Sequence, residues 1–584
     1  MNAVMRINYR IWLLSLFILP FIQGGYFNYA VLGFGVIHSI VLGVVIVSGK
    51  FTFRIDGVRL FAIGLFILNL LNFESAIDIG MQPFGILRNL VPVMVILCYD
   101  SFKAIDEKQV NHQVANTFII SATFMALIVI GSIVVLPNPH VVRSFFIQES
   151  RLGGFFQYAN TFGIYIFGAI VLVIYKNPPT RLRRSLLMIF TMMIALSQSR
   201  MTFVVLSVYS LILCFFLPKH RKDIFWMGLG FILSQGILYF LLPEFNVYRS
   251  YDLDMNASEF QSRLLYYEDG ISMIRQRLRG YGYMGYYYTQ RFFQTGATYH
   301  VRYIHSSVLQ ASLDYGILAG GLFIGQLVFF LNKILQSIRQ KKIEKAIGFI
   351  GITGFFLHSF ADFDVQFIAY VILLYMLVLI IDDNIAIKSV RLQTAAIYLI
   401  GAWVAIFTVA YAYFLIPAIY TYQGEYEKAL EAYPYYTKAM TGWIHEGYNQ
   451  EEDFDAKVQR FVEQNAYYYE GFAFLREYYY NSGDLKKSLF YSYQCKKLAP
   501  LWIENYARHL DISYLILHGR YEAGTLSKDD SLFSEIFRLE YELEQLEKER
   551  GNSYNIKHKA QFSLTPQMTR RINMTHRLYD AVME

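Results

Sequence analysis

The chain has 584 residues, of which 55% are hydrophobic and 17% aromatic, while only 17% are charged. Apolar runs long enough to cross a bilayer, which takes about 20 residues, recur through residues 1–417. This composition excludes a soluble globular domain and favours an all-α, polytopic membrane protein. The net charge of +7 divides into +12 over residues 1–417 and −5 over residues 418–584. The basic excess therefore belongs to the membrane part, which indicates membrane orientation and anionic ligands and argues against nucleic acid as a partner.

The pattern predicts a bundle of about 12–13 transmembrane helices. No small-residue cleavage site follows the first apolar run, so it is interpreted as a transmembrane helix and not as a signal peptide. The three cysteines form neither a disulfide framework nor a metal-binding spacing. The expected spans are residues 9–27, 29–48, 58–72, 82–98, 114–136, 157–175, 183–199, 201–217, 224–242, 308–332, 346–361, 364–381 and 395–417.

Basic residues predict the orientation of these spans, because Lys and Arg collect in cytoplasmic loops. With the N-terminus inside, the inner segments hold 21 Lys and Arg, and the short outer loops hold three, namely Arg143, Arg151 and Arg200. The long loop 243–307 and the segment 418–584 are then expected outside the cell membrane. The position of segment 418–584 depends on an odd number of spans.

Arg200 and Arg151 break the charge rule on the outer face. Arg200 lies in ALSQSRMTFVVL, at the expected tip of a tight hairpin between two apolar runs. Arg151 and Asn160 lie in ESRLGGFFQYANTFG, where the Gly-Gly pair allows a close backbone approach. Each arginine alone suits either a snorkelling surface residue or a ligand-binding residue.

The long outer loop carries two further candidates. Ser258 is a suitable N-cap for an amphipathic helix that ends near Gly280, and Arg263 lies in its first turn, where a cation opposes the helix dipole. His305 lies where the loop meets the tenth span, and an imidazole can accept a proton from a hydroxyl near neutral pH. Arg275, Arg277 and Arg279 are interpreted as a solvated face.

His358 and Asp362, in LHSFADFDVQF, are expected at the outer end of the eleventh span, where polar groups line cavities. Two D-x-D strings, Asp252 to Asp254 and Asp362 to Asp364, are weak indications of a metal site. Arginines together with a histidine fit another chemistry better. Guanidinium groups match phosphate oxygens, and a histidine can act as the base that activates a hydroxyl. A sugar could therefore be transferred from a diphosphate carrier to a hydroxyl without a metal or other cofactor.

Four segments resemble the superfamily of O-antigen ligases and O-antigen polymerases, over roughly residues 80–385. They are R-x-G-G-F-x-x-x-x-N from Arg151 to Asn160, the S-R pair at Ser199 and Arg200, the loop ending in G-Y-G-Y before HSSVLQASLDYGILAGG, and L-H-S-F-A-D-F-D. Members commonly have His-Asn where this chain has His305-Ser306, and a small residue where it has Met201.

The resemblance implies a GT-C-like membrane glycosyltransferase that is metal-independent and inverting. It implies an undecaprenyl-diphosphate-linked glycan as donor and a hydroxyl of a glycan, lipid or protein as acceptor, on the outer face of the cell membrane. Arg200 and Arg263 would engage the donor diphosphate and His305 would activate the acceptor. Arg151, Asn160, His358 and Asp362 are added as substrate-binding candidates. Polymerase and ligase activities stay open.

Residues 418–584 are expected to form an outer α-solenoid. Segments 422–440 and 470–500 resemble tetratricopeptide helix pairs, although their turn glycines, Gly424 and Gly483, do not have the usual 34-residue period. The last 30 residues are expected to be loosely ordered.

Two other functions stay open. A flippase or transporter would need inverted repeats, which the sequence does not show, but Arg88 within the fourth span suits a transport path. A membrane scaffold acting through its repeat domain would leave Arg200, Arg263 and His305 unexplained.

Overall fold

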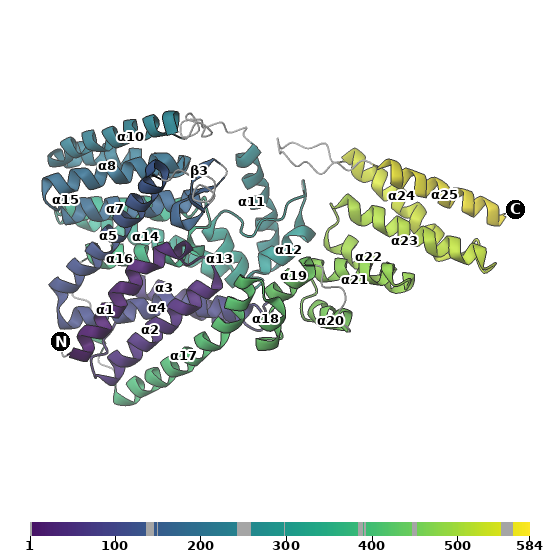
Figure 1. The fold of residues 1–584 in the computed structure, drawn as a ribbon, viewed down its shortest axis with the longest axis horizontal. Coiled ribbons are helices and arrows are strands. Elements are labelled where there is room, and N and C mark those ends of the chain that lie inside the picture. Colours follow the sequence, from purple (N-terminus) through teal and green to yellow (C-terminus); the bar gives the residue numbers. More distant parts are fainter. Residues whose placement is uncertain are drawn as a thin grey trace.

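The computed structural model describes residues 3–135, 145–148, 150–241, 258–296, 298–382, 389–390, 393–446, 453–549 and 564–583. The described structure is almost entirely helical, as the composition predicts (Figure 1). The bundle consists of α1 (Ala3–Ile18), α2 (Asn28–Val47), α3 (Gly57–Leu71), α4 (Gln82–Ile105), α5 (Glu107–Val135), α7 (Ala159–Lys176), α8 (Thr180–Ser197), α9 (Arg200–Phe216), α10 (Arg221–Leu241), α13 (Ser307–Tyr315), α14 (Ile317–Arg339), α15 (Ile343–His358), α16 (Ile368–Ile381) and α17 (Thr394–Gln423).

Short elements connect these helices. Two-residue strands form two antiparallel pairs. β1 (Phe53–Arg54) pairs with β4 (Ser389–Val390), and β2 (Ile147–Gln148) pairs with β3 (Arg151–Leu152). The 3-10 turns are η1 (Leu19–Phe21), η2 (Gln23–Gly25), η3 (Gly154–Phe156), η4 (Pro218–His220) and η5 (Asp364–Gln366).

A helix occupies each of the thirteen expected spans, but fewer of them are long enough to cross a membrane alone. By length and composition, eight helical stretches in the described residues qualify, and α3, α9 and α16 are shorter apolar helices. With a rise of about 1.5 Å per residue, a helix as short as α16 falls below the bilayer thickness of about 30 Å. Nearly every side chain of α16 is buried within the bundle, so neighbouring helices and not lipid surround this short helix.

The expected tenth span is interrupted at Gly316, which separates α13 from α14. Gly316 has φ +92°, and a Cβ there would lie 2.8 Å from the carbonyl oxygen of Arg279. The backbone amides of Tyr281 and Gly282 donate to the carbonyls of Leu313 and Asp314, at 2.6 and 2.9 Å. The outer loop therefore packs directly on the end of α13, and a single continuous helix over 308–332 is wrong.

One end of the bundle carries buried ion pairs between helices. Arg183 at the start of α8 lies 2.8 Å from Asp223 of α10. Lys333 of α14 and Lys345 of α15 lie 2.8 and 2.6 Å from Asp382. The basic segments assigned to the cytoplasm meet at this end, whereas Arg200, Arg263 and His305 belong to the other end, which we call the site end.

The outer loop forms α11 (Ser258–Gln276) and α12 (Gly285–Phe293) at the site end. The helix expected here is present, with Ser258 as its first helical residue, and it ends four residues before Gly280. The C-terminal helices pack on the same end. Arg291 of α12 lies 2.8 Å from Glu470, and the Asn465 amide donates to Asp78 at 3.3 Å. The loop and the C-terminal helices therefore share one end of the bundle, and their position outside the membrane stays a prediction.

The C-terminal helices run from the bundle toward the C-terminus (Figure 1). They are α18 (Tyr426–Ala432), α19 (Thr437–His445), α20 (Phe454–Gln464), α21 (Tyr469–Asn481), α22 (Leu485–Leu498), α23 (Ile503–Glu522), α24 (Ser531–Glu549) and α25 (Pro566–Met583). The expected domain boundary at 417 lies inside α17, so one continuous helix links the two parts. Gly483, with φ +83°, turns the chain between α21 and α22. The assignment to tetratricopeptide repeats stays a prediction.

The expectation of a loosely ordered C-terminus is wrong for residues 566–583, which form α25. Met568 and Ile572 of this helix are buried in a cluster with Leu510 and Leu517 of α23. The segment is polar in its average composition, but its apolar residues are spaced to form one helix face that packs on α23.

Candidate active site

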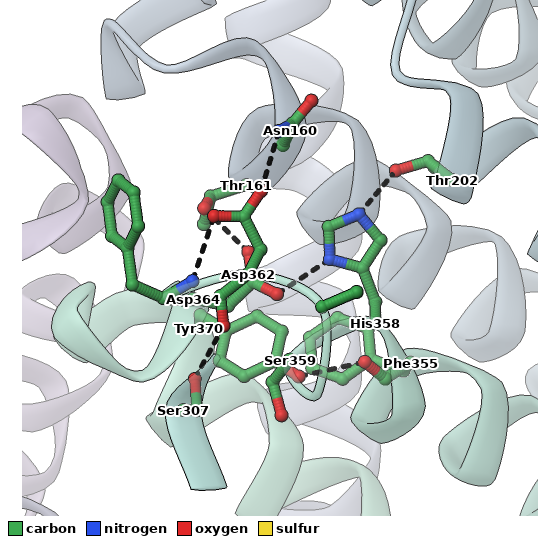
Figure 2. A network of polar contacts seen from close by, with 12 residues as sticks. Asn160, Thr161, Thr202, Ser307, Phe355, His358, Ser359, Asp362, Asp364 and Tyr370 are labelled. Atoms are coloured by element: carbon green, nitrogen blue, oxygen red, sulfur yellow. Dashed lines mark hydrogen bonds and ion pairs between the residues drawn. The ribbon is translucent and has the colours of Figure 1, made fainter. Parts of the chain in front are cut away.

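Asp362 is the centre of a polar cluster at the site end. It lies in the turn between α15 and α16 and is almost fully buried. The Tyr158 hydroxyl donates to both carboxylate oxygens, at 2.8 Å from Oδ1 and 3.0 Å from Oδ2. The Asn160 amide donates to Oδ2 at 2.6 Å (Figure 2). A buried carboxylate with several donors is fixed in position and stays charged.

Two of the predicted catalytic residues also approach this carboxylate. Arg263 Nη2 lies 3.8 Å from Asp362 Oδ2, and Arg263 Nη1 donates to the Ala361 carbonyl at 3.1 Å. His305 Nδ1 lies 3.5 Å from Asp362 Oδ1. Burial alone would raise the pKa of Asp362, but the His305 imidazole and the Arg263 guanidinium hold that pKa below its usual value.

His305 has an unusual backbone. Its φ of +56° lies in the left-handed region, which is uncommon for a residue other than glycine and typical of functional sites. Contacts on both sides hold it there: the Tyr267 hydroxyl donates to the His305 carbonyl at 2.7 Å, and the Ser307 amide donates to the carbonyls of Ser359 and Asp362. The imidazole lies edge-on to Phe363, with ring centroids 5.0 Å apart, and its side chain is 22% exposed. One edge of the ring thus faces Asp362 while part of the ring stays accessible.

Ser306 explains the departure from the His-Asn pattern. It is the N-cap of α13, and its hydroxyl accepts from the Leu309 amide at 3.4 Å. Serine and asparagine are both preferred N-caps. Either residue can therefore start α13 directly after His305.

Arg151 joins the Asp362 cluster through Asn160, because its guanidinium donates to Asn160 Oδ1. Its Nε also donates to the Ser197 carbonyl, at 3.4 Å, at the end of α8. The neighbouring glycine pair permits this arrangement: a Cβ on Gly153 would lie 2.8 Å from the Tyr158 amide nitrogen. The close backbone approach expected from the Gly-Gly pair is confirmed.

His358 belongs to a second, adjacent chain of contacts. Its Nδ1 lies 2.6 Å from Asp364 Oδ2, and its Nε2 lies 3.2 Å from the Thr202 hydroxyl (Figure 2). The Thr202 hydroxyl lies 2.9 Å from that of Ser199. Because protein groups contact both ring nitrogens, His358 is placed to position α9, and its role in substrate binding stays a prediction.

Arg200 is the first residue of α9, directly after Ser199, which caps the helix. The expected hairpin tip is confirmed, since α8 ends at Ser197. Among the described contacts, Thr202, two residues after Arg200, contacts His358, and His358 contacts Asp364 beside the Asp362 cluster. Its role toward a diphosphate stays a prediction.

The sequence interpretation missed Tyr158 and Thr161. Tyr158 lies only two residues before Asn160, and Thr161 donates to Asp364 at 2.6 Å (Figure 2). Both residues are close to Asn160 in a polar stretch at the start of an expected span, and this position could have indicated them as site residues. In the sequence Asp364 stands out only as half of a D-x-D string, whereas in the structure protein donors contact both Asp362 and Asp364. Asp252 and Asp254 lie outside the described residues.

The sequence model of the O-antigen ligase family matches residues 185–324, a stretch that contains Arg200, Arg263 and His305. No curated protein and no solved structure matches the chain. The match supports the O-antigen ligase family over this stretch and, with it, a role in cell-surface glycan assembly at the membrane.

Proposed function

We propose that the protein transfers a glycan from an undecaprenyl-diphosphate-linked donor to a hydroxyl group on the outer face of the cell membrane. The observation that carries this proposal is the contact of one buried carboxylate, Asp362, with both His305 and Arg263. In the described structure Nδ1 of His305 lies 3.5 Å from the carboxylate and makes no hydrogen bond, so the carboxylate acts through its charge. A negative charge beside Nδ1 favours the tautomer with the proton on Nδ1, in which Nε2 accepts a proton. The same carboxylate holds a guanidinium beside the base.

The proposed reaction is a single displacement. Nε2 of His305 takes the proton of the acceptor hydroxyl, and the acceptor oxygen attacks the anomeric carbon of the donor sugar. The bond between that carbon and the diphosphate oxygen breaks, and the diphosphate leaves with the bonding electrons. Arg200 and Arg263 stabilise its growing negative charge, with Arg151 nearby. Attack from the side opposite the leaving group inverts the anomeric configuration, and this proposal requires neither a metal nor another cofactor.

The proposal places residues 418–584 outside the membrane as a small helical, tetratricopeptide-like domain beside the site. The acceptor would be a lipid-linked saccharide, a lipid or a protein. Contacts of this domain with Arg291 of α12 and with Asp78, which precedes α4, support a position beside the site end.

Complementation of cells that lack the protein tests this function, with surface glycan resolved by size on a gel. Arg200→Ala, Arg263→Ala and His305→Ala should each abolish mature glycan at normal membrane expression. Arg275→Ala is the matched control, because Arg275 is exposed on the same helix as Arg263. Normal glycan in all three site variants would refute the proposal.

The product that accumulates separates the two reaction types. Single lipid-linked units in the inactive variants would identify a polymerase. Long lipid-linked chains without their final acceptor would identify a ligase.

A further inference from the structure

A second group of cations lies near the candidate site and surrounds the turn at Tyr26 and Phe27. Arg88 of α4 donates to the Tyr26 carbonyl. The Arg302 guanidinium lies over the Tyr26 ring, 4.9 Å from its centroid. Lys438 of α19 lies over the Phe27 ring, with Nζ 5.7 Å from its centroid. A membrane helix, the outer loop and the C-terminal part each contribute one cation.

No carboxylate pairs with these three cations within the described part of the chain. Arg88 donates to the carbonyls of Gly25, Tyr26 and Gln366, so neutral groups hold it. This explains the arginine within the fourth span that suited a transport path. Arg88 is buried, whereas Arg302 and Lys438 are half-buried. Bringing like charges together away from bulk water without a counter-charge is costly, and folded proteins normally pair such charges.

Unpartnered donors mark the same place. Among the residues that the structure describes, the Nε atoms of Arg88 and Arg302 and the hydroxyl of Tyr303 are buried and have no hydrogen-bond partner. Burial and the charges of Arg302 and Arg88 lower the pKa of Lys438 to about 7. Donors and positive charge without an acceptor are complementary to an anion.

Four aromatic side chains connect this cation group to the candidate active site. The rings of Tyr303 and Phe363 have centroids 5.3 Å apart, and those of Tyr26 and Phe367 are 4.9 Å apart. Phe363 directly follows Asp362, and Arg302 lies three residues before His305. These rings therefore connect the two groups: Phe363 adjoins the Asp362 cluster, and Tyr26 contacts Arg302 of the second cation group.

We propose that Arg88, Arg302 and Lys438 form a second phosphate-binding site, which holds the diphosphate of a lipid-linked acceptor. This inference rests on the proposed transfer reaction and deepens it. Two guanidinium groups and an ammonium suit a group that carries several negative charges. An acceptor anchored by its own diphosphate would bring its sugar hydroxyl toward His305, because Arg302 lies only three residues before it. The C-terminal part then completes the acceptor site through Lys438.

The test counts bound farnesyl diphosphate on the full-length protein in detergent by native mass spectrometry. Wild type and the control Lys428→Met, an exposed lysine of α18, should bind two molecules. Lys438→Met and Arg302→Gln should each bind one, and Arg200→Ala with Arg263→Ala should also bind one. Wild type and these four variants are compared at the same concentration of farnesyl diphosphate.

The outcomes separate this inference from the proposed function. If wild type binds a single molecule, which Arg200→Ala with Arg263→Ala removes and Lys438→Met keeps, the second site is refuted while the donor site stands. If Lys438→Met alone removes the single molecule, the donor site is refuted while the second site stands. Binding of phosphatidylglycerol or free diphosphate equal to that of farnesyl diphosphate at the Lys438-dependent site would refute the lipid-linked acceptor.

Thermal unfolding provides a readout that a merely structural lysine would not give. Without ligand, Lys438→Met should unfold at a higher temperature than wild type, because it relieves repulsion from Arg302. Farnesyl diphosphate should then stabilise the variant less than wild type. A lower unfolding temperature of Lys438→Met together with an unchanged ligand effect would overturn the inference.

Discussion

The Nδ1 atom of His305 lies 3.5 Å from Oδ1 of Asp362, although the two residues belong to different turns, one before α13 and one after α15. The Ser307 amide donates to the Asp362 carbonyl at 3.0 Å and holds these turns together. The pairing of base and carboxylate is thus fixed by backbone as well as by side chains. This relationship makes Asp362 as important to the proposed reaction as His305.

Asp362→Asn should lower the transfer rate by about 100-fold or more, since it removes the charge that orients His305 and lies beside Arg263. The rate of glycan transfer by purified protein, at saturating donor, measures this effect. Thermal unfolding in detergent should accompany the assay, because Asp362 is buried. Activity within about twofold of wild type in a folded variant would show that Asp362 does not serve the base.

Thr202→Val should weaken donor binding more than the chemical step. The change leaves His358 Nε2 without its partner and loosens the start of α9 beside Arg200, at a cost of about 1–3 kcal/mol in stability. We expect KM for the donor to rise while kcat changes little. Thr353→Val is the matched control, since the one hydrogen bond of the Thr353 hydroxyl within the described residues goes to the Phe349 carbonyl of its own helix. Equal effects of the two variants on KM would contradict a positioning role.

Arg291 and Glu470 should couple the outer loop to the C-terminal helices. They lie 2.8 Å apart with side chains 7% and 9% exposed, and the guanidinium lies over the ring of Tyr469, 4.4 Å from its centroid. Breaking a buried pair costs about 3–5 kcal/mol, so Arg291→Met and Glu470→Gln should each destabilise strongly.

A double-mutant cycle of thermal unfolding measures this coupling. The double variant should lose less stability than the two single losses added together. The exposed pair Arg538 and Glu542 should show no such coupling. Additive losses at Arg291 and Glu470 would mean that the contact does not join the two parts.

His300, beside Arg291, should make stability depend on pH. Burial and the Arg291 charge lower the pKa of His300 from 6.5 to about 4. The unfolded chain therefore binds the proton more readily between these values, and stability present above pH 6.5 is lost as the pH falls toward 4.

The unfolding temperature from pH 7 to about pH 4.5 tests this dependence. His300→Gln should flatten the decrease, whereas His518→Gln, at an exposed position, should leave it unchanged. A decrease of the same size in His300→Gln and wild type would assign the pH dependence to other groups.

Local patterns predicted much of the fold. Two apolar runs around Ser199 and Arg200 identified the α8–α9 hairpin, and Ser258 identified the start of α11. The break at Gly316 was not predictable from hydropathy, because it arises from close packing of the outer loop on α13. α25 was missed because its stability comes from burial against α23, which a polar average does not reveal.

The candidate site was predictable in its charged residues but not in its connections. Asp362 receives donors from Tyr158 and Asn160, which are more than 200 residues earlier in the chain. Such pairings depend on how the helices assemble. The left-handed backbone of His305 likewise depends on contacts with Tyr267 and with the turn at Asp362. The residue types were visible in the sequence, and their shared centre at Asp362 was not.

The release of lipid diphosphate from lipid-linked glycan most directly tests the central claim. The donor can be extracted from cells that lack the protein and supplied to purified wild type and to His305→Ala, with and without acceptor. The account predicts that wild type releases lipid diphosphate only when acceptor is present, and that folded His305→Ala is slower by about 100-fold or more. Release by His305→Ala at the wild-type rate would contradict the assignment of His305 as the base and of this cluster as the active site.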